Sequence, residues 1–414
     1  MSETVVGSSS LFRKGFGLKD QVAADLGRDY DHDLVSYLQE NDYELKTEAV
    51  HVFLAREFGF CYGVERAVDY AYETRRRFPG RRLFLTTEII HNPKVNRRLM
   101  EMGVRFLSGQ YASGITVDDL TPEDVVLLPA FGVATRDLDR LGETGCVIVD
   151  TTCGSVANVW RRVERYAREG FTSVIHGKHD HEETVATASR AESLEGGKYL
   201  VVRDLSETDL VCDYIRDRGN REGFLETFGN RSSTGFDPDL HLVKIGVANQ
   251  TTMLSSESLE IAGRIRSALS ERYGEESIQD HFLSFDTICS ATQDRQDAVL
   301  DLVRRDLDLM IVVGGFNSSN TGHLCEIAGE RFPSYHIDEV SRIEGREKIT
   351  HKKPGSEPTI VTENWLPDGF CRVGFTAGAS TPNQVVGRVI SRVLDLKGVR
   401  VREILDRGRG STAS

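Results

Sequence analysis

From His51 onward, short apolar runs alternate with amphipathic stretches along nearly the whole chain. A short apolar run next to a stretch of helical periodicity is typical of a βα unit, and successive βα units pair their strands in parallel. The sequence therefore predicts an α/β fold with largely parallel sheets. In chain order the runs read VFLAREF, RLFLTTEII, VVLLPAFG, CVIVDTT, TSVIHG, YLVVRD, LVKIGVAN, FLSFDTI, LDLMIVVGG and CRVGFTAG.

The stretches between these runs predict helices with recognisable ends. Gly170 and Gly274 each follow one of them and suit its C-terminus, because glycine readily adopts the positive φ found there. The helices expected are Val64–Arg76, Ala157–Arg168, Ser255–Arg272, Gln293–Arg304 and Asn383–Leu396.

The length of the chain, 414 residues, exceeds the roughly 150 residues expected for one domain. We predict three similar α/β lobes at residues 51–152, 153–287 and 288–400. An N-terminal extension, 1–50, precedes them and a C-terminal tail, 401–414, follows.

Local patterns refine this division. The extension should be helical in its middle, since Leu26, Tyr30, Leu34 and Leu38 recur every four positions on one face. Two stretches rich in glycine, proline and charge are expected to be long surface loops. They are Asp217–Asp239 and Glu344–Pro358.

The charge balance restricts the partners of the chain. A formal net charge of -13 argues against nucleic acid or an anionic membrane as the main partner, because both require a basic face. No apolar run approaches the roughly 18 residues that would cross a bilayer. The start, MSETVVGSSS, lacks both the basic and the apolar regions of a signal peptide. We therefore expect a cytoplasmic protein in which local positive groups bind any anionic substrate.

Three of the seven cysteines occur in similar settings. Asp150-Thr151-Thr152-Cys153 ends one apolar run and opens a helix, and Asp286-Thr287-Ile288-Cys289 does the same later in the chain. A looser copy, Phe58-Gly59-Phe60-Cys61, also joins an apolar run to a helix. These repeats suggest that each lobe delivers one cysteine.

A cysteine between a strand and a helix lies where ligands bind in open α/β sheets, and the helix terminus favours its thiolate. That position suits a metal ligand or a nucleophile; the alternative is a small buried hydrophobe. We prefer this alternative for Cys146, Cys212, Cys325 and Cys371, which lie inside strand-like or helix-like runs. No CxxC pair is present, which excludes a zinc ribbon or a thioredoxin motif. Three thiolates are unusual for zinc, but they suit an iron-sulfur cluster that leaves one iron open to a substrate.

Polar loops follow five of the apolar runs. Each places hydroxyl, amide or imidazole groups just before an expected helix, an arrangement that can bind phosphate without a P-loop. Each group taken singly could instead be an ordinary helix cap. The loops are Glu88–Asn92, His176–Thr187, Asn249–Thr252, Asn317–Asn320 and Ala379–Thr381.

Some charged and titratable groups remain open to two interpretations. His176, His179 and His181 could form a metal site with neighbouring carboxylates. Of Glu182 and Glu183, one could cap a helix while the other acts as a general acid. The arginine pairs Arg81/Arg82, Arg97/Arg98 and Arg161/Arg162 are expected on solvated faces.

The motifs together resemble the 4-hydroxy-3-methylbut-2-enyl diphosphate reductase family, in its plant and cyanobacterial subtype. The resemblance extends from about Leu11 to Leu396. It is carried by FGFCYGVERAV, EIIHNPKVNRRL, VDTTC, IHGKHDHEETVATAS, VANQTTMLSSE, TICSATQDRQDA, GGFNSSNTGHL and TAGASTP.

The resemblance implies a 4Fe-4S cluster on Cys61, Cys153 and Cys289 at the centre of three α/β lobes. It also implies a diphosphate substrate, with Glu183 and Thr251 serving the substrate hydroxyl. Thr292 would be a further pocket residue. The diphosphate would be held by His91, His181, Ser318, Ser319, Asn320 and Ser380.

Two positions depart from patterns of the family. Phe131 stands where many bacterial members have a diphosphate-binding histidine. Phenylalanine is usual at this position in the plant-like subtype, but it cannot donate a hydrogen bond to phosphate. Gly154 and Ser155 follow Cys153 where the plant-like subtype commonly has proline and tryptophan. The second departure changes the local shape beside the expected cluster.

The implied reaction is reductive removal of an allylic hydroxyl to give isopentenyl and dimethylallyl diphosphate, the last step of the methylerythritol phosphate pathway. No flavin or nicotinamide motif is present in the sequence, so electrons are expected to come from a partner, and the resemblance implies a ferredoxin or flavodoxin-type donor. Docking of an acidic donor would need a basic patch, for which the arginine pairs are candidates. The alternatives are an iron-sulfur hydro-lyase, which needs no donor, and a cluster-bearing redox sensor.

Overall fold

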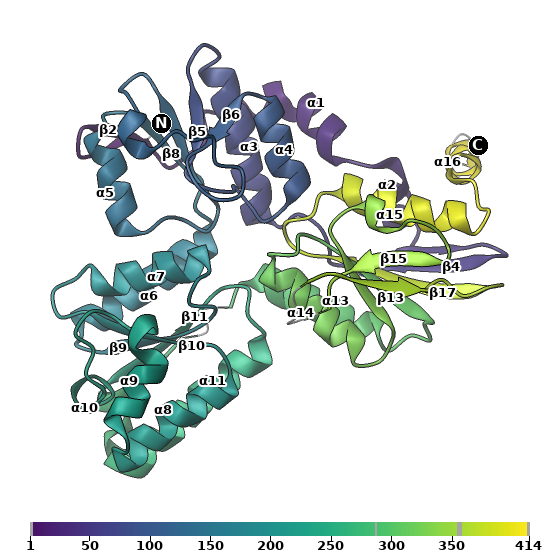
Figure 1. Cartoon of the computed structure of the whole chain (residues 1–414). Coiled ribbons are helices and arrows are strands. Elements are labelled where there is room, and N and C mark those ends of the chain that lie inside the picture. The colour runs from purple at the N-terminus through teal and green to yellow at the C-terminus, as the bar shows by residue number, and fades with distance from the viewer. Residues whose placement is uncertain (1–2, 286–287, 354–357, 412–414) are drawn as a thin grey trace. The chain divides into compact units, whose positions relative to one another are not determined.

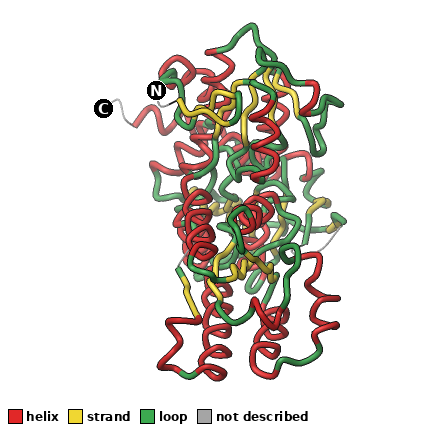
Figure 2. The backbone as a smooth tube through the Cα atoms, turned by 90° about the vertical axis from the view of Figure 1, so that its left-hand side faces the viewer, coloured by secondary structure: helices red, strands yellow, loops and turns green. Residues whose placement is uncertain are grey.

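The computed structural model describes residues 3–285, 288–353 and 358–411, which form two compact units (Figure 1). Unit 1 comprises Met1–Lys14, Phe78–Ile89 and Gly103–Cys289. Unit 2 comprises Gly15–Arg77, Ile90–Met102 and Ser290–Ser414. Helices occupy more of the chain than strands do (Figure 2). None of the helices in the described residues combines the length and the apolar character needed to cross a bilayer.

The first sheet of unit 1 has six strands in the order β1-β2-β8-β7-β5-β6. β1 and β2 form an antiparallel hairpin, whereas the other neighbours are parallel. Leu138 and Leu141 of helix α5 (Thr135–Glu143) pack on one face of this sheet. The strands are β1 (Glu3–Val6), β2 (Ser9–Phe12), β5 (Leu83–Leu85), β6 (Val104–Phe106), β7 (Val125–Leu128) and β8 (Val147–Asp150).

The second sheet of unit 1 is wholly parallel, with the order β10-β9-β11-β12. Val174 and Val247 pack toward α8 and α11, while Ala248 packs toward α6. The central strands β9 and β11 are therefore covered on both faces, and all five residues of each are buried. The strands are β9 (Thr172–His176), β10 (Lys198–Val202), β11 (Ile245–Asn249) and β12 (Phe282–Ser284). The helices are α6 (Gly154–Arg168), α7 (Glu182–Glu192), α8 (Leu205–Asp217), α9 (Arg221–Phe228), α10 (Pro238–His241), α11 (Ser255–Tyr273) and α12 (Ile278–His281).

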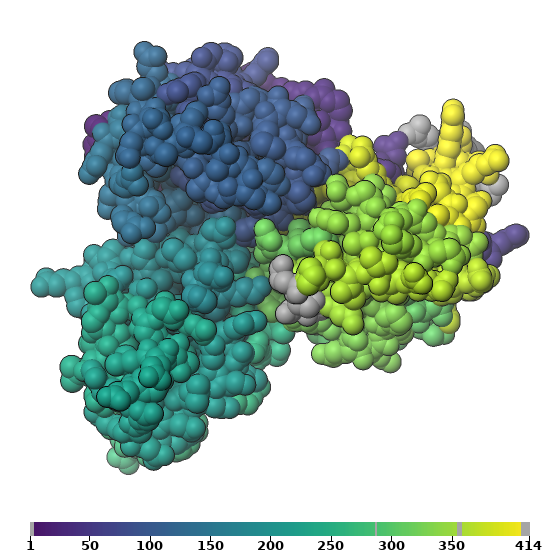
Figure 3. Space-filling view, viewed as in Figure 1, coloured from purple at the N-terminus to yellow at the C-terminus, as the bar shows by residue number. Residues whose placement is uncertain are grey.

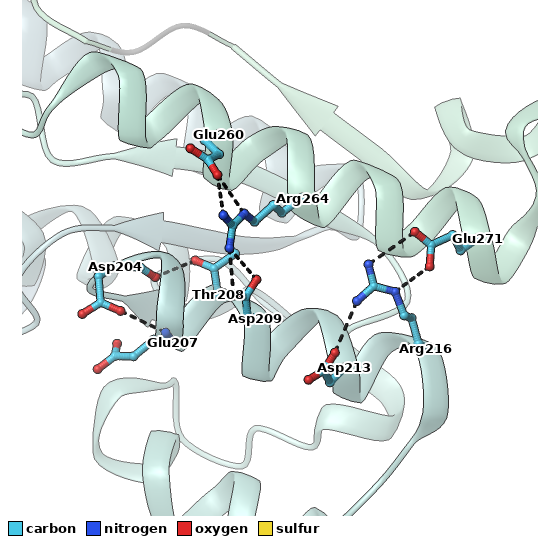
Figure 4. Close-up of polar contacts among 9 residues, drawn as sticks. All are labelled: Asp204, Glu207, Thr208, Asp209, Asp213, Arg216, Glu260, Arg264 and Glu271. Atoms are coloured by element: carbon cyan, nitrogen blue, oxygen red, sulfur yellow. Dashed lines mark hydrogen bonds and ion pairs between the residues drawn. The ribbon is translucent and has the colours of Figure 1, made fainter.

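Ion pairs join α8 to α11 at the surface of unit 1 (Figure 4). Arg264 contacts Asp209 at 2.8 Å and also Glu260, and Arg216 contacts Glu271 at 2.5 Å. Exposed pairs of this kind contribute only about 0–1 kcal/mol each. The buried apolar side chains between these helices therefore dominate the stability of their packing.

Unit 2 contains a five-stranded sheet in the order β14-β13-β17-β4-β3, parallel except for the pair β3 and β4. Ile311 and Phe375 pack toward α2 and α15, whereas Met310 and Val312 pack toward α13 and α14. The strands are β3 (Glu44–Lys46), β4 (Val50–Leu54), β13 (Leu309–Val313), β14 (Ser334–Ile337) and β17 (Cys371–Ala377), with a separate hairpin of β15 (Lys348–His351) and β16 (Ile360–Glu363). The helices are α1 (Lys19–Tyr30), α2 (Asp33–Glu40), α3 (Tyr62–Arg77), α4 (Pro93–Glu101), α13 (Ser290–Leu302), α14 (Ser319–Gly329), α15 (Asn383–Leu396) and α16 (Val401–Ser411).

The predicted α/β class with mostly parallel sheets is confirmed. All five expected helices are present, as α3, α6, α11, α13 and α15. Gly170 and Gly274 follow α6 and α11 with φ of 75° and 87°, so their predicted role at helix ends is also confirmed.

Three local expectations need correction. The N-terminal apolar stripe belongs to two helices, α1 and α2, because the chain turns at Asp31 and His32, and His32 caps α2. The stretch 217–239 is not one long loop, since α9 buries Phe224 and Phe228. The second predicted loop, 344–358, contains strand β15 (Lys348–His351), which pairs with β16 just after it; residues 354–357 lie outside the described residues.

The two ends of the chain contain regular structure. β1 and β2 add to a sheet of unit 1, whereas α1, α2 and β3 belong to unit 2. In the segment predicted as a C-terminal tail, α16 packs Val401 and Ile404 against the core of unit 2 (yellow in Figure 3). The lobe boundaries inferred from the sequence stay a prediction.

Candidate functional site

Three cysteines directly precede helices. Cys61 comes before α3, Cys153 is the N-cap of α6, and Cys289 comes before α13. All three side chains are partly exposed. The predicted strand-to-cysteine-to-helix arrangement is therefore present at each; Asp286 and Thr287 of the repeat lie outside the described residues.

The other four cysteines are all buried, as the sequence predicted: Cys146, Cys212, Cys325 and Cys371. Burial raises the pKa of the Cys212 and Cys325 thiols to about 12. These thiols are therefore protonated at neutral pH and act as small hydrophobes in the core.

Two of the exposed cysteines belong to unit 1, and hydrogen bonds hold the segments around them. The Cys153 N–H donates to the Ala130 carbonyl at 2.7 Å, which fixes the end of β8 against the loop after β7. The Ser155 hydroxyl donates to Cys289 Sγ at 3.2 Å. Because Ser155 is two residues after Cys153, this bond brings the two cysteine segments together.

Glu183 and Thr251 form a buried pair in unit 1. β9 and β11 are parallel neighbours in which His176 pairs with Asn249, so the loops that follow them share one edge of the sheet. The Thr251 N–H donates to Glu183 Oε1 at 2.6 Å, and the Thr251 hydroxyl donates to Oε2 at 3.0 Å. Glu183 is 3% exposed and Thr251 5%. The Glu183 carboxylate is thus buried and bonded to Thr251, and it does not cap α7.

His181 itself caps α7, since its Nδ1 accepts the Glu183 N–H at 3.1 Å. A neutral imidazole that accepts at Nδ1 carries its proton on Nε2 and can donate there. His176 is fully buried with Nδ1 2.8 Å from the Ser258 hydroxyl, while His179 is exposed. The three histidines therefore have separate surroundings, which disfavours the alternative of a shared metal site.

In unit 2, the loops after β13 and β17 meet because these strands are parallel neighbours. Asn320 Oδ1 accepts the Ala379 N–H at 3.0 Å, and the Ser380 hydroxyl donates to the His91 carbonyl at 3.2 Å. Ser318 caps α14, and Ser319 at the first turn is 4% exposed. The predicted residues of unit 2 thus converge at the N-terminus of α14, a position that favours anions.

The loop of Cys61 belongs to the same edge of unit 2. The Cys61 N–H donates to the Ala379 carbonyl at 3.1 Å. Arg295 of α13, 4% exposed, donates to the Gly59 carbonyl at 2.8 Å and to the Phe60 carbonyl at 3.2 Å. Thr292, one turn earlier on α13, is 3% exposed. Sequence analysis missed Arg295, because an arginine in a charged helix gives no local sign that it is buried.

Phe131 packs inside unit 1. Its ring is 7% exposed and lies edge-on to His181, with 6.2 Å between ring centroids. Next to it, Gly132 has φ of 78°, and a Cβ there would lie 2.3 Å from Trp160. The Trp160 ring in turn lies 4.5 Å from the Arg190 guanidinium. Trp160 and Arg190, which sequence analysis also missed, therefore support the loop that carries Phe131.

Phe131→Ala is expected to impair packing more than diphosphate contact, because an aromatic ring has no hydrogen-bond donor for phosphate. Loss of a buried phenylalanine costs about 3–5 kcal/mol, so the thermal midpoint should fall clearly. Calorimetry and substrate titration on the same variant check this. A wild-type midpoint together with about a hundredfold weaker substrate binding would contradict it.

Fold and site define an α/β protein in which three partly exposed cysteines and several polar loops follow strands of largely parallel sheets. The chain belongs to the LytB family, since the model described as "LytB protein" matches residues 52–394. It is 51% identical over 396 residues to the 4-hydroxy-3-methylbut-2-enyl diphosphate reductase of Gloeobacter violaceus, covering 95% of this chain and 94% of that one. The protein of the same name from Thermosynechococcus vestitus is 48% identical over 394 residues, with 95% and 96% covered.

Solved structures agree on the fold. One, described as (E)-4-hydroxy-3-methyl-but-2-enyl diphosphate reductase, the terminal enzyme of the non-mevalonate pathway, matches with a TM-score of 0.51 and 27% identity, covering 84% of this chain and 99% of that one. The reductase from Plasmodium falciparum matches with a TM-score of 0.59 at 20% identity, covering 83% and 88%. The family predicted from the motifs, and the prediction that the chain is an enzyme, are both confirmed.

Proposed function

We propose that this chain converts 4-hydroxy-3-methylbut-2-enyl diphosphate to isopentenyl and dimethylallyl diphosphate, the last step of the methylerythritol phosphate pathway. The allylic C–O bond breaks, the substrate takes up two electrons and two protons, and water leaves. Relatives that carry the reductase name and are 51% and 48% identical to this chain support this choice of substrate. The buried pair of Glu183 and Thr251 supports the mechanism, because it places a carboxyl group within hydrogen-bond distance of a hydroxyl with which it can exchange a proton.

Cys61, Cys153 and Cys289 would hold a 4Fe-4S cluster. Their chemistry fits, since all three are partly exposed thiols at helix N-termini, where the thiolate is favoured. Thiolates are the usual ligands of iron-sulfur clusters. When bound, the cluster supplies electrons one at a time and an open iron for the substrate hydroxyl.

The diphosphate would be held by His91, His181, Ser318, Ser319, Asn320 and Ser380. Asn320 is 1% exposed, and its Nδ2 has no hydrogen-bond partner among the described residues. A buried amide N–H of this kind costs free energy unless a ligand accepts from it. The first turn of α14 offers backbone N–H groups beside it. This combination supports an anionic ligand despite the negative net charge.

Glu183 would deliver the proton to the leaving oxygen. In its protonated form it can donate to Thr251 Oγ1, 3.0 Å away, while the threonine hydroxyl donates onward to the substrate hydroxyl. Burial excludes bulk water from this relay. Thr292 of α13, also buried, would be a further substrate-binding residue.

An anaerobic assay with the diphosphate substrate tests the function. With a reduced low-potential donor, we expect both isoprenoid diphosphates and one water per two electrons. Turnover without any reductant would instead indicate a hydro-lyase. A protein that holds a cluster but leaves the substrate unchanged with donor present would favour the redox sensor.

The electron donor would be a ferredoxin or flavodoxin-type protein that docks on Arg161 and Arg162 of α6. Arg82 pairs with Asp124, and Arg98 with Asp29, so these arginines are already neutralised. Arg161 instead contacts the Asn158 side chain, and Arg162 lies over the Phe285 ring. They lie on the helix that Cys153 begins.

Arg161→Glu with Arg162→Glu is therefore expected to raise the KM for a reduced acidic ferredoxin about tenfold and to weaken its salt dependence. Turnover with a small chemical reductant is the matched control, and it should stay within about twofold of wild type. An unchanged KM for ferredoxin would place the docking surface elsewhere.

A further inference from the structure

Ser155 lies in the first turn of α6, between the segments of Cys153 and Cys289. It is the second residue of α6, directly after Gly154, and its hydroxyl donates to Cys289 Sγ at 3.2 Å. A side chain without a hydroxyl at position 155 could not make this bond.

We infer that Ser155 tunes the reduction potential of the cluster through its hydrogen bond to Cys289, an inference that rests on the proposed function. A thiolate ligand has no proton, so the hydroxyl must be the donor in this bond. Hydrogen bonds to ligand sulfurs are among the determinants of cluster potentials. Such a bond withdraws electron density from the sulfur and therefore stabilises the more negative, reduced form. Ser155 acts through Cys289, which makes it a positioning residue.

The shape of the site leaves this hydroxyl free of competing constraints. A Cβ at Gly154 would meet no atom within 4 Å, so the first turn of α6 is open at that point. The Cys153 N–H is already fixed by the Ala130 carbonyl. The position of Cys153 therefore does not depend on Ser155, and the effect of Ser155 is directed to Cys289.

Potentiometric titration of the anaerobically purified holoenzyme, followed by absorbance and electron paramagnetic resonance, tests the inference. For Ser155→Ala, the ratio of reduced to oxidised cluster at the wild-type midpoint should fall about tenfold, a shift of about 59 mV to more negative potential for a one-electron couple. Iron content should be unchanged. Ser155→Thr, which keeps the hydroxyl, and Gly154→Ala, which changes only the shape, should both retain the wild-type potential.

The outcomes separate the inference from the function on which it rests. A full cluster at the wild-type potential in Ser155→Ala would overturn the tuning role alone. So would an equal shift in Ser155→Thr, since packing and not the hydroxyl would then be responsible. A wild-type protein that cannot be loaded with a cluster would overturn the proposed cofactor and this inference together.

Discussion

Alanine at Cys61, Cys153 or Cys289 is expected to abolish substrate turnover and the brown absorbance that a cluster would give the anaerobically purified protein. Each of these thiols lies at the start of a helix, partly exposed, and a cluster with an open iron has no spare protein ligand. Loss of one thiolate should therefore prevent stable assembly. Iron and sulfide analysis of each variant measures the effect, which we expect to be at least about tenfold in bound iron.

The buried cysteines provide the matched control. Cys146→Ala and Cys212→Ala remove a thiol of the same chemistry from positions that are 0% and 1% exposed. Both variants should keep the cluster, with only the small loss of stability expected when one buried atom is deleted. A full complement of iron in Cys153→Ala would contradict the assignment of the ligands.

The sheets were the most predictable part of the fold. Strands β9, β11 and β13 are buried along their whole length, and each contains the apolar residues that mark a run in the sequence; β13, LMIVV, is apolar throughout. β1 and β2 escaped prediction because each is half polar: β1 reads ETVV and β2 reads SSLF, so neither forms an apolar run. Their pairing with β8 depends on contacts far along the chain, which no local pattern encodes.

The candidate site was predictable in its residue types and in its location at strand ends. Its detailed contacts were not. Glu183 and Thr251 are 68 positions apart, and only the alignment of β9 with β11 brings them together. Arg295 and Ser155 act across still longer separations, 236 and 134 positions. A polar residue of this kind looks like any other in its helix until the fold shows what it contacts.

Glu183→Gln should reduce turnover by about 10² or more while leaving cluster assembly and substrate binding intact. Departure of an allylic hydroxide is slow unless the leaving oxygen is protonated, and a positioned general acid contributes about 10²–10⁴ in rate. Glutamine preserves the size of the side chain and can still accept a hydrogen bond from Thr251. It cannot supply a proton, so the loss should appear in kcat and not in KM.

If Glu183 served only the structure, the same variant would lose about 1 kcal/mol of stability and keep near-normal turnover. Steady-state kinetics and the thermal midpoint, measured on one preparation, separate the two roles. Glu192→Gln is the matched control, because Glu192 is an exposed carboxylate at the other end of α7 that accepts the Thr234 N–H. It should retain turnover within about twofold. The Glu183 carboxylate is buried and bonded to the Thr251 hydroxyl. Turnover of Glu183→Gln within about threefold of wild type would nevertheless exclude Glu183 as the proton donor.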